Sequence, residues 1–300
     1  MAEGIITGAN NASAIATVVA AKTLPPLRAE TCAWGIATMD YEDEVRQFGS
    51  QVDIPIPAEF TTNLMADGGT VTRQANNLGN ASLALNRHRE LTWEHTDVNK
   101  AYASPNLENC SAGQAIANFA EDMDEDLLSV YASFTGTAVG AYNTALTEAV
   151  IDAAETGLFD QRVPGRDRKS LVVTGTGYSN LRLIPRFTEA DKRGSGDAAA
   201  ARLMGQLKGF DVYRAQKCNV TSSTNRHGLA LGPAALLGAV RNLGTDGNGL
   251  GVVQVEMQED GVTIRMTMSY DHPVLGRMTT IDTLYGYVCG RTLHGIEVKH

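Results

Sequence analysis

Two glycines at a predicted strand-to-helix turn are the first residues of this sequence that could do chemistry. Gly175-Thr176-Gly177 follows the apolar run 171–173 and precedes a helical pattern over 178–184. A glycine-rich turn in that position can hold the phosphates of a nucleotide at a helix N-terminus. However, Asn180 stands where the third glycine of a dinucleotide-binding loop belongs, and no run of alternating strands and helices follows. An ordinary turn is the simpler interpretation, and nucleotide binding stays open as an alternative.

Histidines and carboxylates elsewhere do not fall at catalytic or metal-binding spacings. His88 and His95 lie on a strand pattern at odd spacing, which places them on opposite faces of the strand. Asp271-His272-Pro273 reads as a turn, and no serine or cysteine occupies a nucleophile-elbow pattern. The acidic run 121–126 could form a carboxylate site, but such a run is usually a solvated helix face. The sequence therefore predicts no catalytic residue, no metal site, no cofactor and no enzyme.

The composition is that of a globular chain with an acidic surface. The 300 residues are 43% hydrophobic and 20% charged, with a net charge of −9. That charge argues against a protein that chiefly binds nucleic acid, although it allows one that encloses nucleic acid. The four cysteines are far apart and lack metal-binding spacing, so we expect reduced thiols. No apolar run is long enough to cross a bilayer, and no membrane partner is expected.

One long amphipathic helix is predicted from Ser111 to Phe134, with Ser111 and Gln114 as a capping box at its start. Its apolar face holds Ile116, Phe119, Ala120, Met123, Leu127, Val130, Tyr131 and Phe134. Its opposite face holds Glu121, Asp122, Asp124, Glu125 and Asp126. A helix that is apolar on one side and acidic on the other can pack on a core and leave its carboxylates outward.

An extended hairpin is predicted before this helix. Residues 51–97 are strand-like, with a turn signal at 67–69, and Pro55 and Pro57 place the first strand at a sheet edge or in a free arm. Neither face of the hairpin is a continuous apolar stripe, so it buries too little to be stable alone. We therefore expect the hairpin to pack against another subunit.

The remaining elements predict a mixed α/β region followed by β-strands. A second helix is expected from a cap at Asn143 to Gly157, and another helix over 233–240. Strands are expected at 171–173, 209–213, 252–257, 262–270, 278–289 and 293–298, with 252–257 and 262–270 as a hairpin.

The order of these elements resembles the major capsid proteins of tailed bacteriophages, with the HK97-like fold that encapsulins share. Residues 48–55 resemble the start of that family's extended loop, and 115–128 its spine helix. Residues 163–173, 209–213 and 281–286 resemble the join into the axial domain, an axial strand and the C-terminal strand. The likeness covers roughly 12–298 and rests on the ordered set.

The resemblance implies an α+β capsid fold divided into four parts. Residues 1–45 would form an N-terminal arm, 46–97 the extended loop, 98–170 with 250–300 the peripheral domain, and 171–249 the axial domain. It implies a major capsid protein that self-assembles into pentamers and hexamers of an icosahedral head around double-stranded DNA. Residues 51–99 contain no lysine, so a covalent crosslink through a lysine of the loop is not expected.

The same resemblance implies binding partners and a location in the virion. The partners would be other copies of the chain, a separate scaffolding protein, the portal protein and DNA packaged without sequence specificity. The location would be the virion, after assembly in the host bacterial cytoplasm. The alternatives are an encapsulin-type cellular shell, another virion component, or a cytosolic nucleotide-binding α/β enzyme. The hypothesised inter-subunit contacts are Arg73, Arg87, Arg89, Trp93, Glu121, Asp122, Glu125 and Asp126.

Overall fold

The predicted long helix forms the spine of the molecule in the computed structural model. The structure describes residues 32–40, 50–98, 107–163, 169–184, 206–218, 220–221, 225–241, 243–244, 252–259 and 262–300. Helix α4 spans Leu107–Leu128 and continues as the 3-10 helix η1, Ser129–Ser133. Because α4 begins at Leu107, Ser111 lies inside it, and the predicted capping box at Ser111 and Gln114 is wrong.

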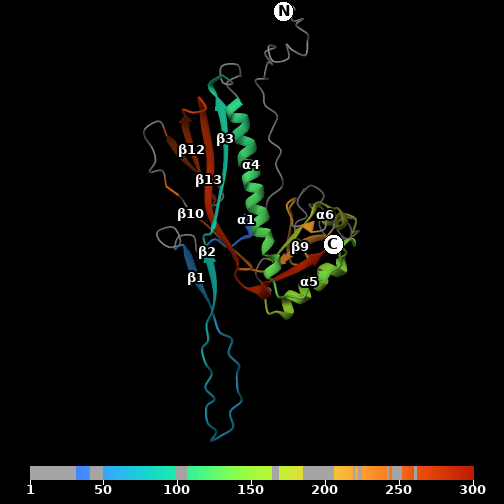
Figure 1. Cartoon of the computed structure of the whole chain (residues 1–300). Helices are drawn as coiled ribbons and strands as arrows, with labels where there is room; N and C mark the ends of the chain where they lie inside the picture. The colour runs from blue at the N-terminus through green and yellow to red at the C-terminus, as the bar shows by residue number, and fades with distance from the viewer. Residues whose placement is uncertain are drawn as a thin grey trace, which may run out of the picture.

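A five-stranded antiparallel sheet lies along α4 (Figure 1). It contains β3 (Arg87–Thr96), β10 (Leu236–Arg241), β11 (Val253–Glu259), β12 (Val262–Asp271) and β13 (Gly276–Cys289). Strand β13 pairs with β3 on one edge and with β12 and then β10 on the other. Phe119 and Met123 of α4 pack against Val240 and Tyr285 of this sheet. The apolar face of the helix is therefore buried against β10 and β13.

The segment predicted as a helix over 233–240 is instead strand β10. All but the last of its residues are buried, and its register places Leu236 opposite Cys289. A short apolar run that is buried on both faces carries no periodicity that separates strand from helix. The predicted hairpin of 252–257 with 262–270 and the strand over 278–289 are confirmed as β11, β12 and β13.

A seven-stranded sheet with two helices forms a second unit of the described chain (Figure 1). Its strands are β4 (Val139–Gly140), β5 (Lys169–Val173), β6 (Gln206–Leu207), β7 (Phe210–Arg214), β8 (Val220–Thr221), β9 (Asn225–Leu231) and β14 (Gly295–Lys299). Helices α5 (Glu148–Asp160) and α6 (Gly175–Arg182) belong to this unit. Its core includes Ile151, Leu158, Leu171, Leu181 and Phe210, all fully buried.

The helix predicted from Asn143 to Gly157 is displaced along the chain. Asn143 has a φ of 58°, a left-handed conformation outside a helix, and α5 begins only after Thr147. Gly157 does not end the helix but lies inside it, where a side chain would meet Ile296. The predicted cap at Asn143 and stop at Gly157 are therefore wrong, although the helix itself is confirmed.

The predicted extended hairpin is present and stands at a sheet edge. Strands β1 (Gln51–Ile56) and β2 (Gly79–Ala84) form a separate two-stranded sheet, in which Pro55 faces Asn80. Residues 57–78 between them form a long loop that reaches away from both larger sheets (Figure 1). Strand β1 pairs with β2 alone among the described residues, so the proline-edged strand predicted from the sequence is confirmed.

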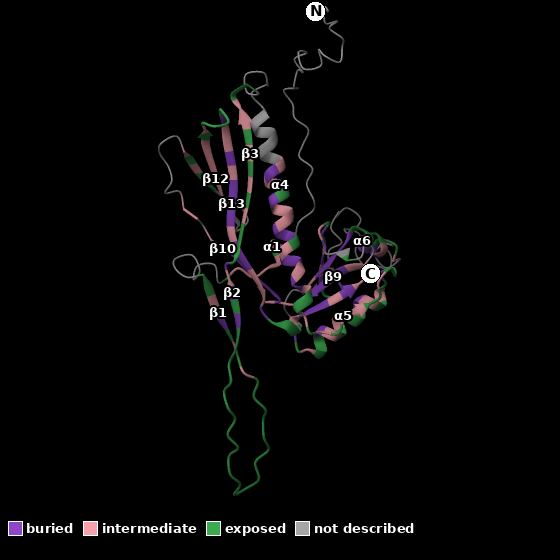
Figure 2. Cartoon of the chain, in the orientation of Figure 1, coloured by how far each residue is buried: buried purple, intermediate pink, exposed green. Residues whose placement is uncertain are grey.

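The two larger sheets meet at the base of α4. Leu127 and Leu128 pack with Leu229 and Leu231 of β9 and with Ala33 of the short helix α1 (Ala33–Ile36). The buried residues gather at this joint and inside the two sheets, whereas the hairpin loop is exposed from Glu59 to Leu78 (Figure 2). One apolar core therefore joins the seven-stranded sheet and its helices, called the compact unit below, to α4 and the five-stranded sheet.

The predicted α+β fold class is confirmed, while the domain limits stay a prediction. Most of the predicted arm, 1–45, lies outside the described residues. Strand pairing differs from the predicted division at particular elements: β10 and β3 belong to the five-stranded sheet, and β14 to the seven-stranded one. Both sheets combine segments that are far apart in the sequence, and residue patterns do not reveal such pairings.

Candidate assembly surface

The loop of the extended hairpin exposes apolar side chains that its own chain does not cover. Each of these side chains is more than half exposed, and they are Phe60, Leu64, Met65, Val71 and Leu78. Single exposed apolar residues are ordinary, but such a group on one projecting segment marks an interaction site. The loop carries few charges, with Arg73 among them. Its chemistry is that of a surface buried in a larger assembly.

Few contacts hold this loop to the rest of the chain. The predicted turn at 67–69 is confirmed by a φ of 73° at Gly68 and a hydrogen bond of 3.0 Å from Gly69 N to Ala66 O. The two arms are joined through Gln74, whose Oε1 accepts from Thr61 N at 2.9 Å. In the described part of the chain, the ion pair from this loop to the compact unit joins Glu59 to Arg162 at 3.6 Å, and both side chains are largely exposed. Such a surface pair contributes little.

Arg89 fastens strand β3 to helix α4 and strand β13. Its Nη2 lies 2.9 Å from Asp126 Oδ2 and its Nη1 lies 3.2 Å from Asp122 Oδ2. Its Nε donates to Tyr285 Oη at 2.8 Å, and that hydroxyl donates to Asp126. Burial opposes the charge on Arg89, but the hydrogen bonds with Asp126 and Tyr285 outweigh burial and raise its pKa. The predicted pairing of Arg89 with these acids thus exists within one chain, and its inter-subunit role stays a prediction.

The other acidic residues of α4 do not all face solvent as predicted. Asp124 is 1% exposed, and its Oδ1 accepts hydrogen bonds from Cys32 N at 3.1 Å and Ala33 N at 2.7 Å. Burial raises the pKa of the Asp124 carboxyl against the opposing effect of these amides. The burial of Asp124 could have been predicted from its spacing, because it lies three residues before Leu127, on the edge of the apolar stripe. The solvent-facing prediction is wrong for Asp124.

Glu121 and Glu125 form ion pairs with Lys217. Lys217, in the turn after β7, places its Nζ 3.9 Å from Glu121 Oε2 and 3.6 Å from Glu125 Oε2. These pairs connect α4 to the compact unit across the joint between the sheets. Both acids are therefore engaged within the subunit, and their role between subunits stays a prediction.

The remaining hypothesised contact residues are dispersed. Arg87 Nη2 donates to Tyr287 Oη at 3.3 Å, and its guanidinium lies 5.7 Å from the centre of that ring. Trp93 stands on β3 opposite Thr279 and is half-buried. Arg73 lies in the exposed hairpin loop, where the ion pairs of the described residues do not include it. The structure does not gather these residues into one patch, and their roles stay predictions.

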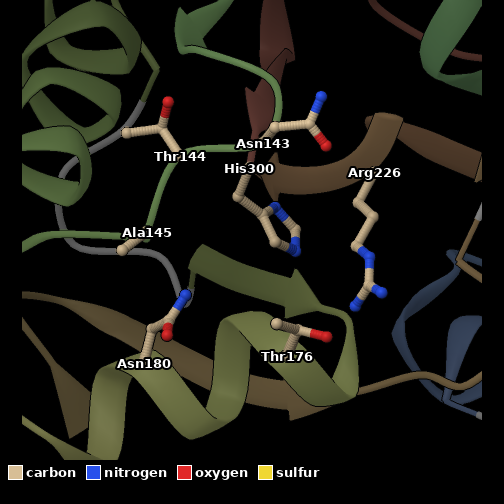
Figure 3. Close-up of a pocket in the computed structure, with 7 residues that line it drawn as sticks. All are labelled: Asn143, Thr144, Ala145, Thr176, Asn180, Arg226 and His300. Carbon is tan, nitrogen blue, oxygen red and sulfur yellow. The ribbon is translucent and has the colours of Figure 1, made fainter. Parts of the chain in front are cut away.

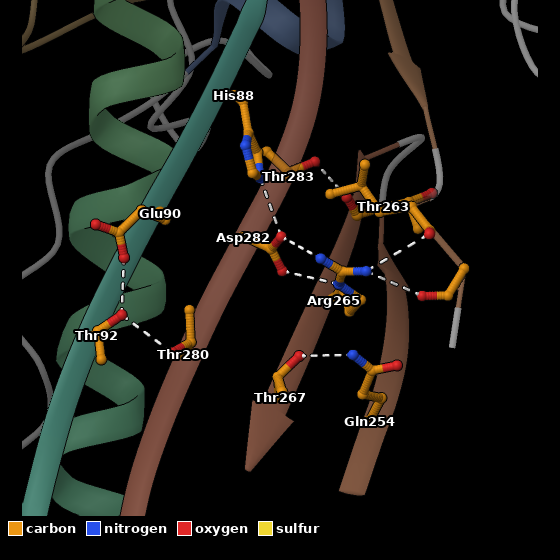
Figure 4. A network of polar contacts seen from close by, with 12 residues as sticks. His88, Glu90, Thr92, Gln254, Thr263, Arg265, Thr267, Thr280, Asp282 and Thr283 are labelled. Carbon is orange, nitrogen blue, oxygen red and sulfur yellow. Dashed lines mark hydrogen bonds and ion pairs between the residues drawn. The ribbon is translucent and has the colours of Figure 1, made fainter. Parts of the chain in front are cut away.

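A second polar network, which the sequence did not reveal, ties strands β3, β12 and β13 together (Figure 4). Arg265 binds the Asp282 carboxylate through two hydrogen bonds of 3.0 and 2.6 Å, and His88 Nε2 lies 3.0 Å from the same carboxylate. Although burial alone raises the pKa of Asp282, the hydrogen bonds from Arg265 and His88 hold it below its usual value. The His88 side chain itself stays 54% exposed, as a solvated histidine would be, while Nε2 of its ring binds a buried acid.

The glycine-rich turn singled out by the sequence opens helix α6. Thr174 caps the helix, its Oγ1 accepting from Gly177 N at 3.3 Å. A side chain on Gly177 would lie 2.8 Å from Nε2 of the His300 ring, so packing requires glycine there. The strand-to-helix turn is thereby confirmed, with a structural reason for the second glycine.

Two further observations concern metal and membrane. Within the described ranges, no group of three or more His, Cys, Asp or Glu side chains is placed to hold a metal ion. The described helices include none that is long and apolar enough to span a bilayer.

The fold matches solved capsid structures over nearly the whole chain. A chain of Mycobacterium phage Che8 is 16% identical with a TM-score of 0.73, covering 95% of this chain and 96% of its own length. The capsid of the cyanophage P-SCSP1u is 15% identical with a TM-score of 0.62, over 95% and 93%. The capsid of Ralstonia phage GP4 is 12% identical with a TM-score of 0.63, over 99% and 98%. No family model and no curated protein matches the sequence. At such identities the likeness shows the fold, and the predicted HK97-like capsid fold is confirmed.

Proposed function

We propose that this chain is the major capsid protein of a tailed bacteriophage. In this role it assembles into pentamers and hexamers of an icosahedral head that encloses double-stranded DNA. The observation that carries the proposal is the projecting hairpin loop with its uncovered apolar side chains, on a fold shared with phage capsid subunits. An icosahedral shell is built from one subunit that repeats the same contacts under symmetry, and this loop suits such a contact.

The energetics of the loop support burial against a second copy. Fully burying one large apolar side chain contributes about 1.5 to 3 kcal/mol. Phe60, Leu64 and Val71 are more than half exposed, on a loop that reaches away from the core of the described residues (Figure 2), so a second copy of the chain can cover them. In a shell, each subunit buries its own loop on one neighbour and covers the loop of another. The free energy of this burial is therefore repeated at every subunit, which makes closed assembly cooperative.

The proposal includes a place and a set of partners. The protein is structural rather than enzymatic and resides in the virion capsid after assembly in the host bacterial cytoplasm. A separate scaffolding protein guides assembly, a portal protein occupies one vertex, and DNA is held without sequence specificity. The net charge of −9 fits enclosure of DNA better than tight binding to it.

A pair of loop variants tests this proposal. We expect Phe60→Ser combined with Leu64→Ser to prevent assembly, because each contact loses about 3 to 6 kcal/mol of apolar burial. The matched control, Phe60→Leu with Leu64→Met, keeps the apolar character and should assemble as wild type does. Sedimentation velocity measures the assembled fraction, and circular dichroism checks that both variants fold.

Each outcome bears on the function directly. Loss of assembly in the serine variant alone, with an intact subunit fold, supports a shell held together through the loop. Wild-type assembly by the serine variant would contradict the role of the loop. Loss in both variants would show that the exact loop shape matters rather than its apolar surface.

A further inference from the structure

A pocket in the compact unit lies apart from the loop and from the joint between the sheets. Its volume is about 290 Å³, and it opens between the segment before α5, helix α6 and the ends of β9 and β14, where Arg226 and His300 lie (Figure 3). The side chains that matter to the argument are Asn143, Thr176, Asn180, Arg226 and His300. The lining contains no acidic side chain.

Arg226 supplies the charge of this pocket. Its side chain extends beside His300 toward the turn that holds Thr176 (Figure 3). The ion pairs formed among the described residues do not include Arg226, although the chain as a whole carries a net charge of −9. A guanidinium is always charged and prefers a fork of anionic oxygens. The Arg226 guanidinium therefore has no side-chain carboxylate partner among the described residues.

The His300 imidazole is neutral, so it is not a second charged group in the pocket. Its Nδ1 lies 3.2 Å from Val298 O and so carries the proton, while Nε2 accepts from Thr174 Oγ1 at 2.6 Å. Burial lowers the pKa of His300, and the positive charge of Arg226 lowers it further. The imidazole thus lines the pocket as a polar, uncharged group, and Arg226 is the charged side chain of the lining.

The first turn of α6 adds backbone donors on the opposite side. Gly177 N and Tyr178 N are satisfied by Thr174, but the amides of Gly175 and Thr176 precede the first helical hydrogen bonds. A side chain added at Gly175 would meet nothing within 4 Å, and its φ is not left-handed. Neither packing nor backbone geometry therefore demands glycine at 175. Of Gly175 and Thr176, Thr176 lines the pocket.

We propose that this pocket binds a small phosphate-bearing anion, either inorganic phosphate or a phosphate monoester. Arg226 binds the oxygens from one side, the amides at the start of α6 bind them from the other, and Asn143 and Asn180 offer side-chain amides. Phosphate fits better than a flat carboxylate because these donors approach from several directions. The pocket volume leaves room for a small organic group. This binding is independent of the proposed capsid function.

Titration of the full-length protein with inorganic phosphate tests the proposal. We expect saturable binding by isothermal calorimetry at constant ionic strength, and a dissociation constant about tenfold to a hundredfold weaker in Arg226→Gln. The matched control is Arg182→Gln, at the exposed far end of the same helix, which should bind phosphate as wild type does. Thermal unfolding without phosphate checks that both variants fold.

Two results of the phosphate titration would contradict the proposed binding. Equal phosphate affinity in wild type and Arg226→Gln would overturn the proposal, as would a heat signal that never saturates. A parallel titration with a short DNA duplex separates the small anion from DNA. If the duplex binds through Arg226 and phosphate does not, the pocket is a DNA-backbone contact and the proposal is wrong.

Discussion

Replacing Arg89 by alanine separates a fastening role inside the subunit from a role between subunits. In the structure, the guanidinium binds Asp126, Asp122 and the hydroxyl of Tyr285. The bond to Asp122 counts for little because that side chain is 49% exposed. Asp126 is only 15% exposed, so it loses a charge-assisted partner in a partly buried place. We therefore expect Arg89→Ala to lower the free energy of unfolding by about 2 to 3 kcal/mol.

Urea unfolding of the unassembled subunit, followed by circular dichroism, measures this loss. Arg87→Ala is the matched control, because Arg87 is exposed and its contact with Tyr287 should contribute less than about 1 kcal/mol. The double variant Arg89→Ala with Asp126→Ala should show a coupling of about 1 kcal/mol or more. Equal stability of Arg89→Ala and Arg87→Ala would refute the fastening role. If Arg89→Ala failed only in assembly, the original inter-subunit hypothesis would be supported instead.

Three further predictions concern packing and protonation. Gly286→Ala should cost about 2 to 3 kcal/mol in urea unfolding, because the added carbon would lie 2.1 Å from Ala84 O; a loss below about 1 kcal/mol would contradict this. The pKa of His300 is lowered in the folded protein, so unfolded chains bind the proton more readily, and stability should fall as pH drops below about 6.5. His300→Gln should lose that part of the slope in unfolding measured from pH 7.5 to 5, and equal slopes would disprove the assignment. Burial raises the pKa of Cys289 to about 11, so iodoacetamide at pH 8 should label it only after unfolding; rapid labelling of the native protein, read by peptide mass spectrometry, would contradict this.

The elements with a clear period were predictable from the sequence. The apolar stripe through Met123 and Leu127 identified the spine helix, and alternation over 262–270 identified β12. Strand β10 was missed because a strand buried on both faces has no alternation to read. Helix ends were also displaced, since α4 begins before Ser111 and α5 after Asn143.

The contacts of charged residues were harder to predict than the elements. The sequence favoured pairing between Arg89 and the acids of α4, but it holds no information on whether the partners belong to one chain or two. Asp124 was misplaced because carboxylates usually face water, whereas here it satisfies two backbone amides of the segment at Cys32 and Ala33. The network around Asp282 depends on the pairing of strands that are far apart in the sequence, which no local pattern reveals.

Electron microscopy of the negatively stained, purified chain tests the capsid function most directly. The chain should be imaged alone and after co-expression with the product of a neighbouring gene, because a scaffolding partner can be required. We expect closed shells, tubes, or rings of subunits with five- or six-fold symmetry in at least one of these conditions. Compact monomers or dimers under every condition would contradict it.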